Sequence, residues 1–227
     1  MNSRNWTEDE AKMAFALYFL LDLREFNKSN PDAISLAFTI DRTPAAVSAK
    51  LWNISAHDTN HIEAGYSGMR HASKLDHQIW TEYDSRGDKL VAESAQLLTN
   101  AVASRGNKLT SFQRISTELD SLPESREKMA IVKRRINQQY FRSTLLTSYG
   151  GACCITGLAV PSLLVASHIK PWACCDPKTE RLAGRNGVLL NVLHDRAFDQ
   201  GHITINTDYR VRISHRIKQS QDQLGWL

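Results

Sequence analysis

The apolar runs between residues 149 and 205 are only a few residues long. Runs of this length predict short strands and a short helix, and they exclude a long helix in this stretch. Leu163–Ile169 and Asn186–Leu190 each have the length of a short strand, whereas Asn191–Asp199 fits a helix that ends before Gly201. His202–Ile205 then alternates like a final strand. The predicted order is therefore strand, loop, strand, helix, with one more strand behind.

The N-terminal half carries helical signals instead. Thr7–Glu10 has the spacing of a capping box and starts an apolar pattern that predicts a helix to about Phe26. Asn30–Pro31 and Thr43–Pro44 each place a capping residue before a proline, which favours the start of a helix. Further helices are predicted, after a loop at 57–70, over 73–86, 90–102 and 125–148.

The first three predicted helices, the last of them Pro44–Asn53, are short, and a tight polar turn separates the second from the third. This pattern is typical of a helix-turn-helix, in which the second helix of the pair enters the major groove of DNA. With Val47 and Leu51 packed inward, the side chains expected to face DNA are those of Arg42, Ser48 and Lys50. A plain three-helix bundle without a ligand is the alternative.

The charge distribution favours a polyanionic partner for the C-terminal half. Residues 1–100 hold 10 Lys and Arg against 14 Asp and Glu, whereas residues 101–227 hold 18 against 10. Lys and Arg neutralise phosphates and release their counterions. Arg134 and Arg135 lie on the exposed side of the predicted 125–148 helix and could follow a phosphate backbone. The alternative, which is more common for such a run of basic residues, is a charged helix face that contacts only solvent.

A chain of 227 residues is long enough for two modules. The predicted fold class is α+β, with a mostly helical domain of helix-turn-helix or winged-helix type at 1–103. A linker and basic helix follow at 104–147, and the strand-containing domain occupies 148–227.

Two further observations bear on location and on zinc. The N-terminus lacks the basic start and apolar stretch of a signal peptide, and the apolar run Ala14–Leu21 is far shorter than the roughly 20 residues of a membrane span. A cytoplasmic protein with no membrane crossing and with reduced cysteines is therefore expected. The adjacent pairs Cys153–Cys154 and Cys174–Cys175 lack the C-x2-4-C spacing of structural zinc sites, which argues against structural zinc.

Four motifs follow one another after residue 153: Cys154-Ile155-Thr156-Gly157, Ser167-His168-Ile169-Lys170-Pro171-Trp172, Asn186-Gly187-Val188-Leu189-Leu190 and the stretch from His194 to Gly201. In this order they resemble the HNH nuclease family, also called the ββα-metal nucleases, and in particular its restriction-type branch. The resemblance covers about residues 138–213. It implies a ββα-metal nuclease domain that cuts double-stranded DNA with a divalent cation, Mg²⁺ or alternatively Mn²⁺.

The resemblance also implies the roles of the site residues. His168, at the end of the first strand, would be the general base, a role for which histidine is the residue type most often used. Asn186 would brace the loop and orient the base, and His194 on the helix would bind the metal. From their place in the sequence, close to the base and the ligand, Lys170 and Arg196 could hold the scissile phosphate, and plain surface placement is the alternative.

The sequence departs from the family at one position. Many members have an acidic residue or a histidine just before the base, as a second metal ligand, and here Ser167 stands there. Asp195 and Asp199 are the candidates to replace it, although they lie about 100° and 140° round the helix from His194. Asp199 could instead simply close the helix. A single protein ligand, with water and phosphate completing the shell, is a further alternative.

Three functions are compatible with these features. The first is an endonuclease for double-stranded DNA, of restriction or modification-dependent type, for which a homodimer is the simplest way to cut both strands. The second is a DNA-binding regulator whose HNH module is inactive, supported by Ser167 alone. The third is a ribonuclease or a structure-specific nuclease.

Overall fold

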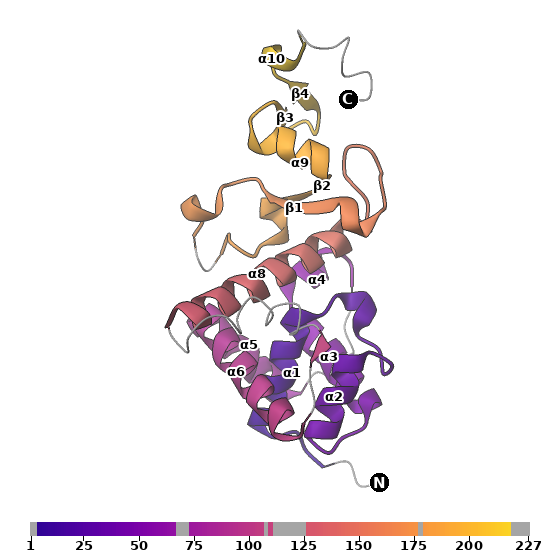
Figure 1. Cartoon of the computed structure of the whole chain (residues 1–227), viewed down its shortest axis with the longest axis vertical. Helices are drawn as coiled ribbons and strands as arrows, with labels where there is room; N and C mark the ends of the chain where they lie inside the picture. The colour runs from indigo at the N-terminus through magenta and orange to yellow at the C-terminus, as the bar shows by residue number, and fades with distance from the viewer. Residues whose placement is uncertain (1–3, 67–72, 107–108, 111–125, 177–178, 219–227) are drawn as a thin grey trace.

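The computed structural model describes residues 4–66, 73–106, 109–110, 126–176 and 179–218. A bundle of helices occupies one end of the molecule, and the small strands and short helices of the C-terminal part occupy the other (Figure 1). Helix α8 (Arg126–Ser148) runs between the two parts. Small antiparallel sheets beside many helices make the fold class α+β, as predicted.

Helix α1 (Glu8–Leu20) begins at the predicted capping box. The Thr7 hydroxyl accepts from the Glu10 amide, and the Glu10 carboxylate accepts from the Thr7 amide. The predicted extension to Phe26 is wrong, because Leu21 has extended backbone angles. Asp22 then starts a separate short turn, η1 (Leu23–Glu25), with a capping box of its own.

The other predicted helices are confirmed within the described residues. Asn30 and Thr43 cap α2 (Pro31–Thr39) and α3 (Pro44–Ser55), and each helix has its proline in the first turn. Helices α5 (Lys74–Arg86) and α6 (Asp88–Ser104) follow. The segment predicted as a loop contains a short helix, α4 (Thr59–Glu63), because the Asp58 side chain caps the amide of Asn60.

Helix α1 is the centre of the bundle. From Met13 to Leu20 every residue is apolar and buried, which is the pattern of a buried helix, and α1 contacts α2, α3, α5, α6 and α8. The rings of Phe19 and Tyr140 lie 4.5 Å apart, centroid to centroid, so α8 contributes to the same core. Ile136 of α8 is fully buried there as well.

The following turn of α8 faces a second core. Phe141 and Leu145 pack with Leu164 and with Val188–Leu190 of the strands. At Gly187 a Cβ atom would lie 2.6 Å from Cζ of Phe141, so only glycine allows the strand to approach the helix this closely. Helix α8 is therefore part of both cores. The domain boundaries predicted around residues 104 and 147 stay a prediction.

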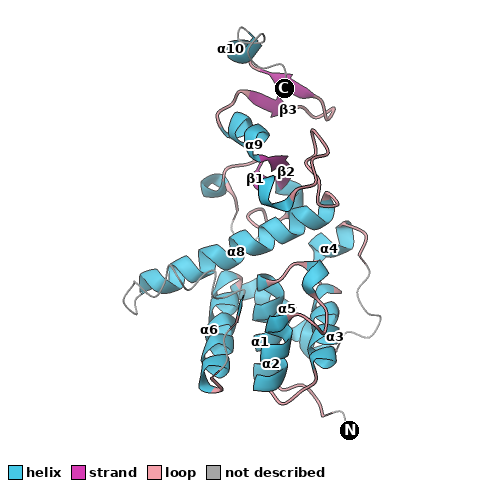
Figure 2. Ribbon diagram, turned by 45° about the vertical axis from the view of Figure 1, so that its right-hand side comes forward, coloured by secondary structure: helices cyan, strands magenta, loops and turns pink. Residues whose placement is uncertain are grey.

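The strands follow the predicted order (Figure 2). Strand β1 (Leu164–His168) pairs antiparallel with β2 (Gly187–Asn191), so that His168 lies opposite Gly187. Helix α9 (Val192–Asp199) comes directly after β2, and β3 (Ile203–Ile205) pairs with β4 (Val211–Ile213). Short elements complete this part: η2 (Pro161–Leu163), η3 (Trp172–Cys174), η4 (Gly184–Asn186) and α10 (His215–Lys218). No helix within the described ranges has both the length and the apolar character needed to cross a membrane.

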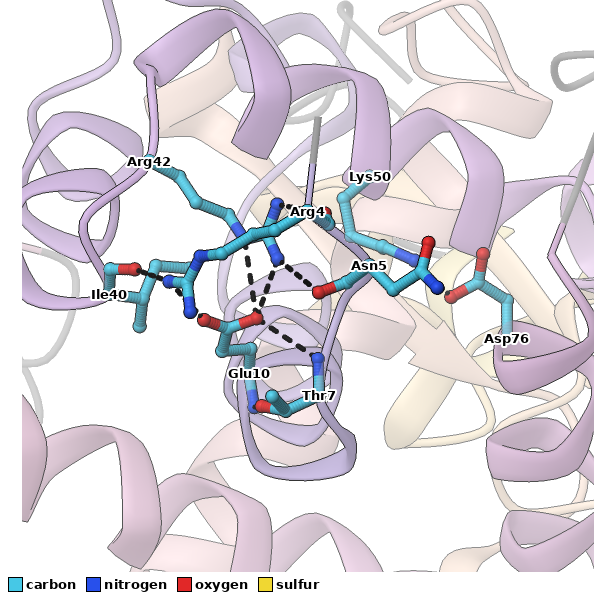
Figure 3. Close-up of polar contacts among 8 residues, drawn as sticks. All are labelled: Arg4, Asn5, Thr7, Glu10, Ile40, Arg42, Lys50 and Asp76. Atoms are coloured by element: carbon cyan, nitrogen blue, oxygen red, sulfur yellow. Dashed lines mark hydrogen bonds and ion pairs between the residues drawn. The ribbon is translucent and has the colours of Figure 1, made fainter. Parts of the chain in front are cut away.

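Charged side chains hold the start of α1 against the turn between α2 and α3 (Figure 3). The Glu10 carboxylate accepts from Nη2 of Arg4 at 2.7 Å and from Nη2 of Arg42 at 2.8 Å. The Arg42 guanidinium also lies over the Trp6 ring, 4.2 Å from its centroid. The Arg42 side chain is 8% exposed. The prediction that Arg42 faces DNA is therefore wrong for this conformation, because its charge is used inside the bundle.

Lys50 is buried more completely. Its Nζ lies 2.8 Å from Oδ1 of Asp76 on α5, and the two side chains are 2% and 0% exposed. The prediction that Lys50 faces DNA is wrong as well, because α3 turns this side chain towards α5 and not towards solvent. Ser48 is half-buried, and its hydroxyl donates to the Phe26 carbonyl at 2.9 Å.

We expect Lys50→Met to destabilise the protein by about 3 to 5 kcal/mol, because it leaves the Asp76 carboxylate buried without its cation. Lys12→Met is the control: Lys12 pairs with Glu8, which is 65% exposed, and with Glu82, which is 28% exposed, so water can solvate the carboxylates left behind and a smaller loss is expected. Urea unfolding of the two variants measures the difference. Equal losses of unfolding free energy would contradict a buried ion pair.

Candidate active site

His168 is held on three sides at the end of β1. Its ring stacks on Phe141 with centroids 3.8 Å apart and planes 11° apart, and the Trp172 ring lies edge-on at 5.5 Å. The Nε2 atom lies 2.9 Å from the carbonyl oxygen of Arg181. A carbonyl can only accept, so Nε2 carries the proton and Nδ1 of the neutral ring carries the lone pair. The ring therefore has its lone pair on Nδ1, on the side away from the Arg181 carbonyl.

Asn186 braces the loop between β1 and β2. Its Oδ1 accepts from the Lys170 amide at 2.9 Å, and its Nδ2 donates to the Glu180 carbonyl at 3.2 Å and contacts Sγ of Cys175 at 3.1 Å. One side chain therefore joins the two ends of this loop. The resemblance to the HNH family implies such a bracing role for Asn186, and its second implied role, orienting the base, stays a prediction.

His194 lies in the first turn of α9 and is 5% exposed. Its Nδ1 lies 2.9 Å from Oδ1 of Asn191. Since an amide oxygen only accepts, Nδ1 carries the proton and Nε2 carries the lone pair. Burial lowers the pKa of His194 below its ordinary value of 6.5, which keeps the ring neutral at pH 7. A neutral imidazole with a fixed lone pair is suited to bind a metal ion.

Asn191 is a site residue that sequence reasoning missed. The same Oδ1 accepts from the amides of Leu193 and His194, so Asn191 caps α9 and orients the histidine at once. The signal in the sequence is an asparagine three residues before His194, at the expected start of a helix.

Asp195 lies beside Ser167, the position at which the sequence departs from the family pattern. The hydroxyl of Ser167 on β1 donates to the Asp195 carboxylate on α9. Ser167 is buried and Asp195 is half-buried. A carboxylate therefore lies beside the strand residue that precedes His168. Asp199 is exposed in the last turn of α9 and is not part of this contact.

The donor set is small for a metal site. In the described parts of the chain, no group of three or more His, Cys, Asp or Glu side chains is arranged to hold an ion. Mg²⁺ keeps several of its waters and takes one or two carboxylates together with substrate phosphate. His194 and its neighbour in sequence, Asp195, could supply at most two such ligands, whereas a closed protein cage would need more.

The predicted phosphate contacts are spread over the surface. Arg196 is exposed on α9, and Arg134 is exposed on α8, where Arg135 is half-buried. Lys170 is exposed and pairs with Glu180, with Nζ and Oε2 2.5 Å apart. Among these residues, Arg196 follows His194 and Asp195 directly in the chain.

The Asn191→Ala substitution tests the orientation of His194. We expect it to cost about 0.5 to 2 kcal/mol of stability as a lost cap, and to weaken Mn²⁺ binding by about 10- to 100-fold as a lost orienting partner. Urea unfolding and Mn²⁺ titration measure the two effects.

Asn30→Ala is the control, because Asn30 caps α2 through two amides in the same way but faces no histidine. It should cost similar stability and leave Mn²⁺ binding unchanged. Equal Mn²⁺ affinities of the two variants would contradict the role of Asn191.

The comparison with known families agrees with this geometry. Residues 153–206 match the model of a family described as HNH endonuclease. The matched range contains His168, Asn186 and His194, and it spans β1, β2 and α9. No curated protein matches the chain. The chain therefore carries an HNH endonuclease domain, to which residues 153–206 belong.

Proposed function

We propose that the protein is a divalent-metal-dependent endonuclease that hydrolyses phosphodiester bonds in double-stranded DNA. The observation that carries the proposal is the orientation of two imidazole rings. His168 and His194 each bind a protein acceptor through one ring nitrogen, which assigns the lone pair to the other. The first ring is thereby oriented to take a proton and the second to bind a cation.

In the proposed reaction, Nδ1 of His168 removes a proton from the attacking water. The water oxygen forms a bond to phosphorus, the bond from phosphorus to the leaving oxygen breaks, and that oxygen takes a proton from solvent. His194 and Asp195 would hold the divalent ion, which supplies positive charge to stabilise the phosphate and the leaving oxygen. Ser167 would orient the Asp195 carboxylate through its hydroxyl.

Substrate binding is proposed to use the basic C-terminal half. Arg196 and Arg134 are exposed there, and Lys170 could exchange its partner Glu180 for a phosphate. A helix-turn-helix reader built from α2, the turn at 40–43 and α3 stays part of the proposal. It no longer includes Arg42 or Lys50, whose charges are used within the bundle.

The finer assignments are also proposals: a restriction or modification-dependent enzyme, a homodimer, a cytoplasmic location, and modules at 1–103, 104–147 and 148–227. A DNA-binding regulator with an inactive module is the second candidate, because Ser167 replaces a ligand of the family. The Asp195 carboxylate beside Ser167 favours the enzyme, since it brings an acidic group to the same place.

Cleavage of supercoiled plasmid tests the proposal. We expect cleavage by the full chain with Mg²⁺ and none after chelation by EDTA. His168→Ala should lower the rate about 10²- to 10⁴-fold, which is the usual contribution of a general base, and should leave DNA affinity unchanged. His215→Ala, at an exposed histidine of α10, is the control that should cleave like the wild type.

Full activity of His168→Ala would rule out the proposed base. DNA binding without cleavage in either Mg²⁺ or Mn²⁺ would favour the regulator. Faster cleavage of matched RNA or single-stranded DNA than of duplex DNA would instead favour the third class of function.

A further inference from the structure

We propose that Asn60 is a positioning residue through which the helical bundle sets the orientation of His168. The inference rests on the proposed function, because it takes His168 as the general base. Asn60 lies in the first turn of α4, in the part of the chain predicted as a loop. The residues that its side chain contacts are far away in sequence, in α8 and in the loop before β2.

The two ends of the Asn60 amide bind the same short segment. Its Oδ1 accepts from the Gly184 amide at 2.9 Å, and its Nδ2 contacts the Leu182 carbonyl at 3.4 Å. A Cβ atom at Gly184 would lie 3.0 Å from Cγ2 of Thr144 on α8, so the segment lies tightly against that helix. A side chain of the bundle thus holds the backbone of the HNH endonuclease domain.

This segment lies between the two groups that arrange the base. Arg181, whose carbonyl accepts from Nε2 of His168, directly precedes Leu182. Gly184 begins η4, and η4 ends at Asn186, the residue that braces the loop. A shift of the segment at Asn60 would therefore move both the acceptor of His168 and its bracing asparagine.

Asn60 is itself held by a buried network. Nδ2 donates to the hydroxyl of Tyr140 at 2.8 Å, and that hydroxyl donates to Oδ2 of Asp58 at 2.6 Å. The Tyr18 hydroxyl donates to the same carboxylate, and Asp58 is 1% exposed. Because the single Tyr140 proton goes to Asp58, Tyr140 must accept from Asn60, which settles which end of the amide faces Gly184.

Loss of the Asn60 side chain is expected to affect the rate of DNA cleavage more than the binding of DNA. A misplacement of about 1 Å at a reacting group can cost about 100-fold in rate, even when the cause lies far from the chemistry. Asn60 is half-buried among the residues that it holds, whereas the exposed cations proposed to contact DNA lie elsewhere on the chain. Loss of its side chain should therefore lower kcat and leave KM for DNA close to the wild-type value.

Two variants and one control test the inference. Asn60→Ala should lower kcat by up to about 100-fold. Tyr140→Phe keeps the ring and removes only the hydroxyl that accepts from Asn60, so a smaller decrease in kcat is expected. Tyr18→Phe removes a hydroxyl from the same Asp58 carboxylate without touching Asn60, and it should lower the melting temperature while kcat stays at the wild-type value.

The second readout is the tautomer of His168, measured by long-range ¹H–¹⁵N correlation spectra of the ¹⁵N-histidine-labelled full chain. The wild type should show the Nε2–H form, and Asn60→Ala should show a mixture of both tautomers. This measurement needs no DNA cleavage, so it tests the inference even where the proposed function fails.

Wild-type kcat and an unchanged tautomer in Asn60→Ala would overturn the inference. So would equal decreases in kcat for Tyr18→Phe and Tyr140→Phe, because general loosening of the bundle would then explain both. Tyr140→Phe and its tautomer carry the test if Asn60→Ala does not fold.

Discussion

Helix α8 packs into two hydrophobic cores, one in the helical bundle and one beneath strands β1 and β2. Neighbouring residues of this helix face different parts of the molecule, about 100° apart round its axis. Tyr140 packs on Phe19 and bonds the buried Asp58, whereas Phe141 stacks on His168. Helix α8 therefore supports the ring of His168 through Phe141 and packs into the helical core through Tyr140. Its two contacts join the bundle to the candidate active site.

Local signals in the sequence predicted most of the elements. Capping residues such as Thr7 and Asn30 interact with backbone amides two or three residues away, so a pattern in the sequence is enough to find them. The strand, loop, strand and helix of the HNH endonuclease domain were predicted from short apolar runs, and the family model matches the same stretch. The roles of His168 and His194 were inferred from the resemblance of the motifs around them to the HNH family, and they stay a proposal.

Partners far apart in sequence were not predictable. Lys50 and Arg42 carry the charges expected of a DNA reader, and only the folded chain shows Asp76 and Glu10 next to them. Asn60 stands 124 residues before Gly184, and the acceptor of His168 is a backbone carbonyl, which no side-chain pattern reveals. The Ser167 hydroxyl likewise finds its acceptor on a different element. The chemistry of this site therefore depends on contacts that only tertiary structure brings together.

In the proposed reaction His168 acts as the base and His194 as a metal ligand. A crystal structure of the full chain with duplex DNA and Mn²⁺, with the ion located by its anomalous scattering, tests both roles at once. We expect one ion bonded to Nε2 of His194 and to a phosphate oxygen, with Nδ1 of His168 facing the phosphorus. An ion bound away from His194, or a phosphate that lies on the Nε2 side of His168, would contradict these roles.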